Sequence, residues 1–472
     1  MMSAPVTTTP SVTFWGAARS VTGSMHLVEA GPYRLLLDCG LARGPRDEAR
    51  LRNRSFPFDP ASIDAVVLSH AHVDHCGNLP NLVRQGFRGP IYCTPATRAL
   101  AAVMLGDAAK IQEEDAEYLN RKRERGEPKV EPLYDGRDVY RTLLQLKDVP
   151  YDTPAELARG LELTFVDAGH LLGSAMVSLR LDTPHGERRL TFTGDLGRPG
   201  LPILRDPARV PPGDFLISES TYGGHTHEPV DETAERLGEV VRRTTARGGK
   251  VLIPAFSVGR TQTVVYFLHQ LAAAGRLPDV PVYVDSPMAA RSTEVFRAHP
   301  ECFNERTLTL LRRDPDLFGG QRVRYIESVH DSIALNGRPE PCVIVSASGM
   351  CEAGRILHHL KHNIEDPRTT ILIAGYQADG TLGRRLVEHQ PQVRILGRTF
   401  SVKAEVVVLN GLSSHADHAG LLAALRPLAG SAHRVCLVHG EPARAEALAE
   451  GLRAAGFAEV TIPDRGDSVT VT

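Results

Sequence analysis

The chain has 472 residues, of which 42% are hydrophobic and 23% charged, and its formal net charge at pH 7 is −2. These values are typical of a soluble globular chain of two or three domains, and they lack the basic character of a general nucleic-acid-binding protein. The apolar runs are too short to span a bilayer, and the first ten residues do not have the pattern of a signal peptide, so no membrane contact is expected. The seven cysteines are scattered without a CxxC pair, so the sequence indicates neither a disulfide framework nor a thiolate zinc site. We therefore expect the protein in the reducing cytoplasm.

From Val12 to about Leu204, strand-like apolar runs alternate with polar loops. Several of these runs end in a loop that carries Asp or His: RLLLDCG, AVVLSHAHVDH, LELTFVDAGH and RRLTFTGDLG. The proline-rich segment GLPILRDPARVPPGD follows and is typical of a crossing between domains. The sequence therefore predicts a first domain region over about residues 11–210.

From Phe215 to about Ile395, each apolar strand-like run is followed by a helix-like segment. The strand-like runs are KVLIPAF, VPVYVDS, PCVIVSAS and TTILIAGYQ. This alternation predicts buried parallel strands with crossover helices over about residues 211–395. A third region, residues 396–472, contains AEVVVLNGLSSHADH, a helix-like AGLLAALRPLA, the run RVCLVHGE and an Ala-rich helix.

The segment HAHVDH, residues 70–75, places three histidines and an aspartate directly after an apolar run. Imidazole nitrogen and carboxylate oxygen suit zinc, and a catalytic zinc keeps one position for water. Because residues two apart in an extended segment point the same way, His70 and His72 can bind one ion. Asp74 and His75 lie on the next turn and can bind a second ion. A single histidine is more often structural, but this density of ligand-type residues favours a metal site.

Three further residues follow strand-like runs and can complete the ligand set: His170 in FVDAGHLLGSA, Asp195 in FTGDLG and His439 in CLVHGE. Each alone can have a structural role, since an aspartate at the end of a strand often caps a turn. Together they can complete two sets of ligands, with Asp195 placed to bridge the two ions.

These residues resemble the motifs of the metallo-β-lactamase-fold hydrolases, and the middle region narrows the resemblance to the β-CASP nucleases. Asp38, HAHVDH, His170 and Asp195 match the first four motifs, and Glu219, His415 and His439 match the additional ones. The segments IPAFSVGRTQ, SASGMCEAGRILHHL and GYQADGTLGRRL are also similar. The resemblance runs from about Val12 to the last residue and is closest to bacterial and archaeal relatives of the pre-mRNA 3′-end cleavage endonuclease.

The resemblance implies an α/β fold in which a Rossmann-like β-CASP domain is inserted into an αββα metallo-β-lactamase sandwich. Residues 11–210 and 396–472 would form the sandwich, and residues 211–395 would form the insertion. The active site would lie in the cleft between the two domains.

The resemblance also implies a zinc-dependent ribonuclease that acts in RNA processing or degradation, with water activated between two Zn²⁺ ions per chain and Mn²⁺ as an alternative metal. His70, His72, His170 and Asp195 would bind the first ion, and Asp74, His75, Asp195 and His439 the second. Asp38 would orient ligands, unless it only caps its turn. His415, kept protonated by Glu219, would donate a proton to the departing O3′, with loop capping as its alternative role. The expected products carry a 5′-phosphate and a 3′-hydroxyl.

Contacts with the RNA backbone are expected from the insertion. Ser348 and Gly349 lie between a strand and a helix, where free backbone N–H groups can bind phosphate, and Arg260 can pair with another phosphate. All three can instead belong to ordinary strand-to-helix turns.

Alternative functions remain open at this point. DNA hydrolysis is found in another branch of the family, although His439 favours RNA because that branch usually has valine there. Small-substrate hydrolases of the fold lack the insertion, and non-catalytic scaffolds of the family have lost metal ligands that are present here. The resemblance also allows a 5′-exonuclease activity and a homodimer.

Overall fold

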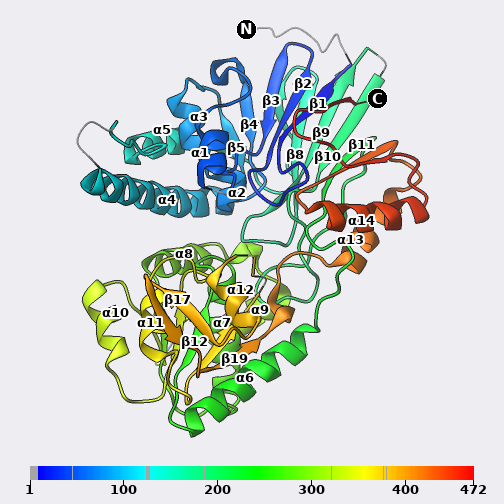
Figure 1. Cartoon of the computed structure of the whole chain (residues 1–472). Helices are drawn as coiled ribbons and strands as arrows, with labels where there is room; N and C mark the ends of the chain where they lie inside the picture. Colours follow the sequence, from blue (N-terminus) through cyan, green and yellow to red (C-terminus); the bar gives the residue numbers. More distant parts are fainter. Residues whose placement is uncertain are drawn as a thin grey trace. The chain divides into compact units, whose positions relative to one another are not determined.

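The computed structural model describes residues 9–44, 46–123, 128–184, 186–319, 322–375, 377–378 and 380–471 (Figure 1). The chain forms two compact units. Unit 1 consists of Met1–Pro199, Asp206–Thr226 and His415–Thr472, and unit 2 consists of Gly200–Arg205 and His227–Ser414. The chain therefore passes between the units within the proline-rich segment.

Unit 1 contains two seven-stranded sheets. The strands of the first are β1 (Ser11–Gly16), β2 (Met25–Ala30), β3 (Tyr33–Leu37), β4 (Ala65–Val67), β5 (Ile91–Cys93), β6 (Leu146–Asp148) and β22 (Ser468–Thr470), in the order β22-β1-β2-β3-β4-β5-β6. Those of the second are β7 (Ala155–Ala158), β8 (Leu161–Asp167), β9 (Ala175–Thr183), β10 (Gly186–Phe192), β11 (Phe215–Glu219), β20 (Arg434–Val438) and β21 (Val460–Thr461), in the order β21-β20-β11-β10-β9-β8-β7. Both the early and the late parts of the chain supply strands, since β1 pairs with β22 and β11 with β20.

Alternate residues of the strands pack on opposite faces, which gives unit 1 four layers. Val28 and Leu35 belong to a core between the two sheets, together with Leu179 and Ile217 of the second sheet. The outer face of the first sheet packs on the helices α2 (Val73–Cys76), α3 (Leu79–Arg84), α4 (Pro95–Lys122) and α5 (Gly136–Gln145), and that of the second packs on α13 (His418–Leu425) and α14 (Pro442–Ala454). Helix α1 (Arg46–Arg54) lies between β3 and β4 in the chain. The predicted αββα sandwich is confirmed.

Unit 2 is built on a six-stranded parallel sheet. Its strands are β12 (Val251–Pro254), β13 (Val282–Asp285), β14 (Val323–Tyr325), β15 (Val343–Ser346), β16 (Thr370–Ile373) and β19 (Glu405–Val408), in the order β14-β13-β15-β12-β16-β19. The helices are α6 (Val230–Ala246), α7 (Arg260–Ala273), α8 (Pro287–Ala298), α9 (Glu305–Leu311), α10 (Val329–Asn336), α11 (Ile356–Asn363) and α12 (Leu382–Val387). A hairpin of β17 (Gln392–Ile395) and β18 (Arg398–Ser401) follows α12. The predicted alternation of parallel strands and helices is confirmed.

Helices cover both faces of this sheet (Figure 1). Val251 and Ile253 of β12 pack with residues of α6 and α7, whereas Leu252 packs with residues of α11 and α12. Short 3₁₀ helices lie at Pro60–Ser62, Pro300–Cys302, Asn410–Leu412 and Arg426–Leu428. In the part of the chain that the structure describes, every helix is too short or too polar to cross a membrane.

The units begin and end at positions that differ from the boundaries expected at residues 211 and 395. Strand β11 lies in the second sheet of unit 1, parallel to β10 and β20, and β19 lies in the sheet of unit 2, parallel to β16. Both are short apolar runs beside a parallel neighbour, and such a run has the same sequence pattern in either sheet. The pattern identifies the strand but not the sheet to which it belongs.

Candidate metal centre

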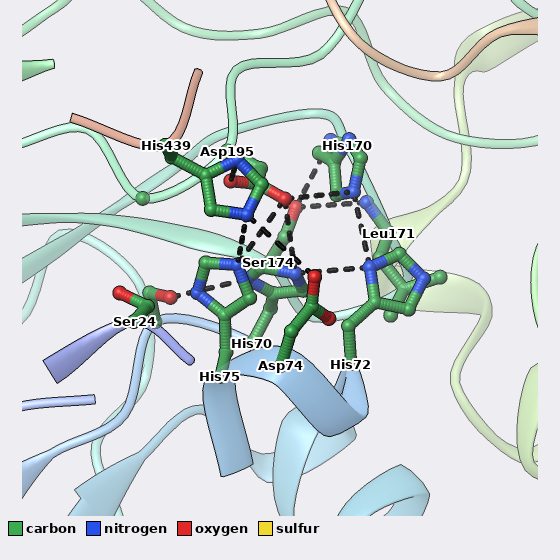
Figure 2. Close-up of polar contacts among 12 residues, drawn as sticks. Ser24, His70, His72, Asp74, His75, His170, Leu171, Ser174, Asp195 and His439 are labelled. Atoms are coloured by element: carbon green, nitrogen blue, oxygen red, sulfur yellow. Dashed lines mark hydrogen bonds and ion pairs between the residues drawn. The ribbon is translucent and has the colours of Figure 1, made fainter. Parts of the chain in front are cut away.

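Loops that follow strands of both sheets of unit 1 bring imidazole and carboxylate groups to one place. His70 and His72 follow β4, Asp74 and His75 lie on the short helix α2, His170 follows β8, Asp195 follows β10 and His439 follows β20. Figure 2 shows these side chains pointing toward a common centre. The structure therefore brings together all seven residues that the sequence suggested as metal ligands.

The first group consists of His70, His72, His170 and Asp195, with one ligand-type atom from each within 4.8 Å of the others. Nδ1 of His72 lies 3.0 Å from Nε2 of His70 and 3.3 Å from Nε2 of His170. Oδ2 of Asp195 lies 3.5 Å from Nε2 of His70 and 3.6 Å from Nε2 of His170. These atoms surround a space in which one cation can contact several of them.

The second group consists of Asp74, His75 and His439. Nε2 of His439 lies 3.2 Å from Nε2 of His75 and 3.6 Å from Oδ2 of Asp74. Oδ2 of Asp195, which already contacts the first group, lies 3.4 Å from Nε2 of His75. Asp195 thus lies between the two groups, where the sequence interpretation placed a bridging carboxylate.

Burial keeps the histidines of the first group uncharged. It holds the pKa values of His70 and His170 well below the usual value for histidine and lowers the pKa of His72 to about 4. Neutral imidazole is the form of the side chain that binds a metal ion. At neutral pH these three rings are therefore ready to act as ligands.

The buried carboxylates make the centre favourable for positive charge. Burial alone would raise the pKa of Asp195, but the surrounding histidines, His439 first, lower it well below its usual range. Burial alone would lower the pKa of His75, but the carboxylates of Asp195 and Asp38 raise it well above its usual value. The negative charges in this closed space therefore favour a cation near them.

The hydrogen bonds around the second group fit a bound metal ion. Nδ1 of His75 donates to Asp38 at 2.7 Å, and Nδ1 of His439 lies 3.1 Å from the hydroxyl of Thr221. Because Nδ1 of His75 donates to Asp38, the neutral form of this ring would present the lone pair of Nε2 to a metal ion at the centre. Oδ1 of Asp195 is buried and, among the described residues, has no hydrogen-bond partner. Imidazole nitrogen and carboxylate oxygen are the donors that zinc and similar metals bind.

Asp38 holds the loop that carries several of these candidate ligands. Its buried carboxylate accepts hydrogen bonds from the Ser69 backbone N–H at 2.8 Å, the Ser69 hydroxyl at 2.9 Å, the Ser24 hydroxyl at 3.1 Å and the His75 ring at 2.7 Å. Two residues further on, Gly40 packs so closely on the carbonyl of Asp74 that a Cβ atom would overlap the oxygen. The loop after β3 thus fixes both the orientation of His75 and the path of α2.

His415 and Glu219 form a pair next to the centre. Nδ1 of His415 lies 3.1 Å from both carboxylate oxygens of Glu219, and its Nε2 lies 3.9 Å from Oδ2 of Asp195. Glu219 ends β11 and also accepts the Leu196 N–H at 2.6 Å. Burial alone would lower the pKa of His415, but Glu219 and Asp195 raise it to about 9. His415 is therefore a positively charged donor at neutral pH.

Ser24, Ser69 and Thr221 contribute to the site but were not identified from the sequence. Ser69 directly precedes His70, and Thr221 follows Glu219 by two residues, whereas Ser24 lies in the loop before β2, far from any motif. A serine or threonine close in sequence to a candidate metal ligand is a candidate hydrogen-bond partner, because metal-binding side chains are usually held by hydrogen bonds. Ser24 offers no such signal.

The predicted RNA-contacting residues of unit 2 lie on loops that contact one another. Arg260 begins α7 and donates a hydrogen bond to the carbonyl of Ala374 after β16. The hydroxyl of Ser348 accepts the Glu352 N–H at 3.1 Å, and the carbonyl of Gly349 accepts Nε2 of Gln377 at 3.0 Å. The loops after β12, β15 and β16 are therefore joined at the carboxyl ends of these strands.

Comparison with known proteins agrees with this architecture. Family models match for a beta-lactamase superfamily domain over residues 33–246, a Beta-Casp domain over residues 261–386 and a Zn-dependent metallo-hydrolase RNA specificity domain over residues 399–463. Ribonuclease TTHA0252 of Thermus thermophilus is 40% identical to this chain, across 97% of the chain and 99% of that protein. The chain belongs to the β-CASP family.

A second relative and a solved structure are also similar to this β-CASP chain. The transcription termination factor FttA of Methanocaldococcus jannaschii is 33% identical across 98% of this chain and 71% of that protein. A crystal structure of a protein of unknown function from Enterococcus faecalis V583 has a TM-score of 0.55 and 15% identity, and the match covers 98% of this chain and 100% of that one. The second likeness concerns the fold alone. The family resemblance drawn from the motifs is confirmed.

Proposed function

We propose that this β-CASP chain is a metal-dependent endoribonuclease that hydrolyses RNA phosphodiester bonds in RNA processing or degradation. The observation that carries the proposal is the convergence of buried imidazole and carboxylate groups on one centre, with the His415–Glu219 pair beside it. The similar Thermus thermophilus protein is named a ribonuclease, and a model of an RNA specificity domain matches residues 399–463. Site chemistry and relatives together support RNA as the substrate, because a fold alone does not define one.

The metal-binding role falls to the two groups described above. His70, His72, His170 and Asp195 would hold one ion, and Asp74, His75 and His439 would hold a second with Asp195 shared. Zn²⁺ suits this set of donors, and Mn²⁺ is the alternative. Such ions, when bound, make water a stronger nucleophile at neutral pH and neutralise charge on the phosphoryl oxygens.

His415 supplies the proton for the leaving group. Because Glu219 occupies Nδ1, the ring offers its Nε2 proton toward the centre. As the oxygen of a hydroxide ion bonds to phosphorus, the bond from phosphorus to O3′ breaks, and O3′ takes the proton from His415. The products then carry a 5′-phosphate and a 3′-hydroxyl. With 19% of its side chain exposed, His415 remains within reach of a substrate.

The remaining assignments concern the substrate and the cell. Arg260, Ser348 and Gly349 would contact RNA phosphates. A 5′-exonuclease activity and a homodimer are further parts of the proposal. All seven cysteines are free and buried, which supports the reducing cytoplasm as the location.

The test uses purified protein with end-labelled RNA and with DNA of the same sequence, each with and without a chelator. We expect RNA to be cut, cleavage to stop with chelator, and His415→Ala to slow cleavage about 10²- to 10⁴-fold. His433→Ala is the matched control, because His433 is an exposed histidine that precedes β20 in the same unit, and it should cut at the rate of the unmodified protein.

The same experiment separates the alternatives. Internal fragments at early times identify an endonuclease, whereas loss of single nucleotides from the 5′ end identifies an exonuclease. Equal cutting of DNA, or cleavage that persists with chelator, would contradict the proposed function.

A further inference from the structure

In the sheet of unit 2, the helical connections that leave two neighbouring strands lead to opposite sides of the sheet. From β12, the chain runs through α7 to β13 on one side, and from β15 it runs through α11 to β16 on the other. Helices α7 and α11 pack on opposite faces of the sheet, since each shares a different core with β12. In open parallel sheets, ligands bind beyond the carboxyl ends of the strands at such a point. The loops after the neighbouring strands β12 and β15 therefore form the place in unit 2 best suited to a ligand.

A large aromatic side chain stands in the loop after β12. Phe256 is 42% exposed, although the residues around it in the loop are small or aliphatic. Its backbone is fixed, because its carbonyl accepts the Thr261 N–H at 3.2 Å and the Thr261 hydroxyl at 2.8 Å. The exposed ring therefore projects from a rigid segment.

The ring of Phe256 rests against the loop after β15. A Cβ atom added to Gly349 would lie 3.1 Å from Cδ2 and 3.2 Å from Cε2 of the ring, so that only glycine leaves comfortable room there. Gly349 is itself held by Gln377, a buried side chain that donates to its carbonyl at 3.0 Å. One side of the ring thus lies against Gly349, and a large part of the side chain is exposed.

We propose that Phe256 is a stacking platform for one base of single-stranded RNA whose backbone is bound by the loop containing Ser348 and Gly349. The proposal rests on the proposed function, since it assumes that RNA is the substrate. Proteins bind single strands through backbone contacts combined with aromatic rings on which bases stack. Phenylalanine has no hydrogen-bonding group, so this platform accepts any base.

A single exposed aromatic residue is common on protein surfaces, and exposure alone therefore does not support the proposal. Tyr118 and Tyr140 on α4 and α5 are also exposed, at 49% and 64%. Phe256 differs from them because it stands at the divergence of the crossovers, on a fixed backbone and against a glycine. Tyr140→Ala is consequently a matched control for loss of an exposed aromatic side chain.

The experiment measures RNA binding by fluorescence anisotropy, with the full-length chain carrying His415→Ala so that the RNA stays intact. The probes are a short single-stranded RNA and a set of the same RNA with one abasic nucleotide at each position in turn. With Phe256 present, one abasic position should weaken binding about 5- to 150-fold, the range for loss of one stacked base. Phe256→Ala should weaken binding of the intact RNA by a similar factor and remove the sensitivity at that position.

Two further variants separate stacking from folding. Phe256→Trp should retain affinity and the abasic profile, whereas Phe256→Leu, which keeps an apolar side chain, should behave like Phe256→Ala. Gly349→Ala should weaken binding as well, because its methyl group displaces the ring. Thermal melting of each variant should match that of the parent protein, and Tyr140→Ala should leave the abasic profile unchanged.

The outcomes also distinguish this inference from the proposed function. If the unmodified protein cuts RNA and the His415→Ala protein binds it, but the added Phe256→Ala keeps the same affinity and the same sensitive position, the stacking role is overturned and the ribonuclease proposal stands. If the unmodified protein does not cut RNA and the His415→Ala protein does not bind it, both are overturned. Within the His415→Ala chain, equal affinity with Phe256→Leu and with Phe256 would also overturn stacking, because leucine has no π-face.

Discussion

Replacing Asp38 by Asn should weaken metal binding although it substitutes none of the predicted metal ligands. Oδ1 of Asp38 accepts the Ser69 N–H, and Oδ2 accepts the His75 ring N–H. Asparagine has one oxygen for these two donors, and its NH₂ group must face the other. If the NH₂ group faces His75, the ring must turn to its other tautomer and place its proton on Nε2, the atom that points into the centre.

The size of the effect follows from this loss of one ligand orientation. Removing the hydrogen-bond partner of a metal-binding histidine typically costs 10- to 100-fold in metal affinity. This corresponds to about 1.4–2.7 kcal/mol. The loss should fall first on the group that contains His75, because that ring contacts Asp38 directly, whereas His70 is linked to Asp38 only through the Ser69 hydroxyl.

The assay is a zinc titration of the metal-free protein in competition with a chromophoric chelator. Asp214→Asn is the matched control, because Asp214 also accepts a backbone N–H, from Arg189 at 2.7 Å, and precedes β11 at the end opposite Glu219. Asp38→Asn should lower the zinc affinity of one of the two binding steps, whereas Asp214→Asn should leave both affinities unchanged. Unchanged zinc affinity in Asp38→Asn would refute the role assigned to this carboxylate.

Three other changes have defined outcomes. Gly40→Ala should lower both zinc affinity and melting temperature, because its Cβ would overlap the carbonyl of Asp74; calorimetry with and without zinc measures both, and an unchanged melting temperature would contradict the close packing. Removal of metal should lower the melting temperature, since an ion at about 1,000 times its Kd contributes ~4 kcal/mol, and a transition insensitive to chelator would argue against a bound ion. Burial alone would raise the pKa of Asp285, but hydrogen bonds from His359 and Arg355 lower it, so its contribution to stability is present above about pH 4 and lost as the pH falls further. Asp285→Asn should lower the free energy of unfolding by ~3–5 kcal/mol at neutral pH and make it fall less as the pH is lowered. Urea unfolding at several pH values measures both, and an unchanged free energy of unfolding at neutral pH would contradict this role of the hydrogen bonds.

The metal-ligand candidates could be predicted from the sequence because their chemistry is carried by residue type and short spacing. The interval from His70 to His75 spans six residues, so the chain itself guarantees that these side chains are close. His170, Asp195 and His439 were found through another local signal, a polar residue at the end of an apolar run. The structure adds their convergence, which depends on how strands far apart in the chain pair.

Other parts of the site and fold could not be predicted, because they depend on contacts between distant segments. Ser24 reaches Asp38 from a loop without a motif, and no local pattern distinguishes it from any other serine. Strand β11 looks the same whether it joins β10 or the sheet of unit 2, since both places bury a short apolar run. Phe256 lies in a motif noted in the sequence, but its contact with Gly349 depends on the adjacency of β12 and β15.

The positions of the proposed ligands would tie a bound metal to the packing of the two sheets in unit 1. His70, His72, Asp74 and His75 follow a strand of the first sheet, whereas His170, Asp195 and His439 follow strands of the second. An ion held by both sets links the sheets, and its binding free energy therefore also stabilises their packing. The reverse also holds, because the apolar core between the sheets sets the distance between the two sets of ligands. A small shift in that core would move Asp195 relative to His75, and displacements of about 1 Å are enough to cost 10²-fold in rate. The hydrophobic residues between the sheets are thus as much a determinant of the metal geometry as the ligands themselves.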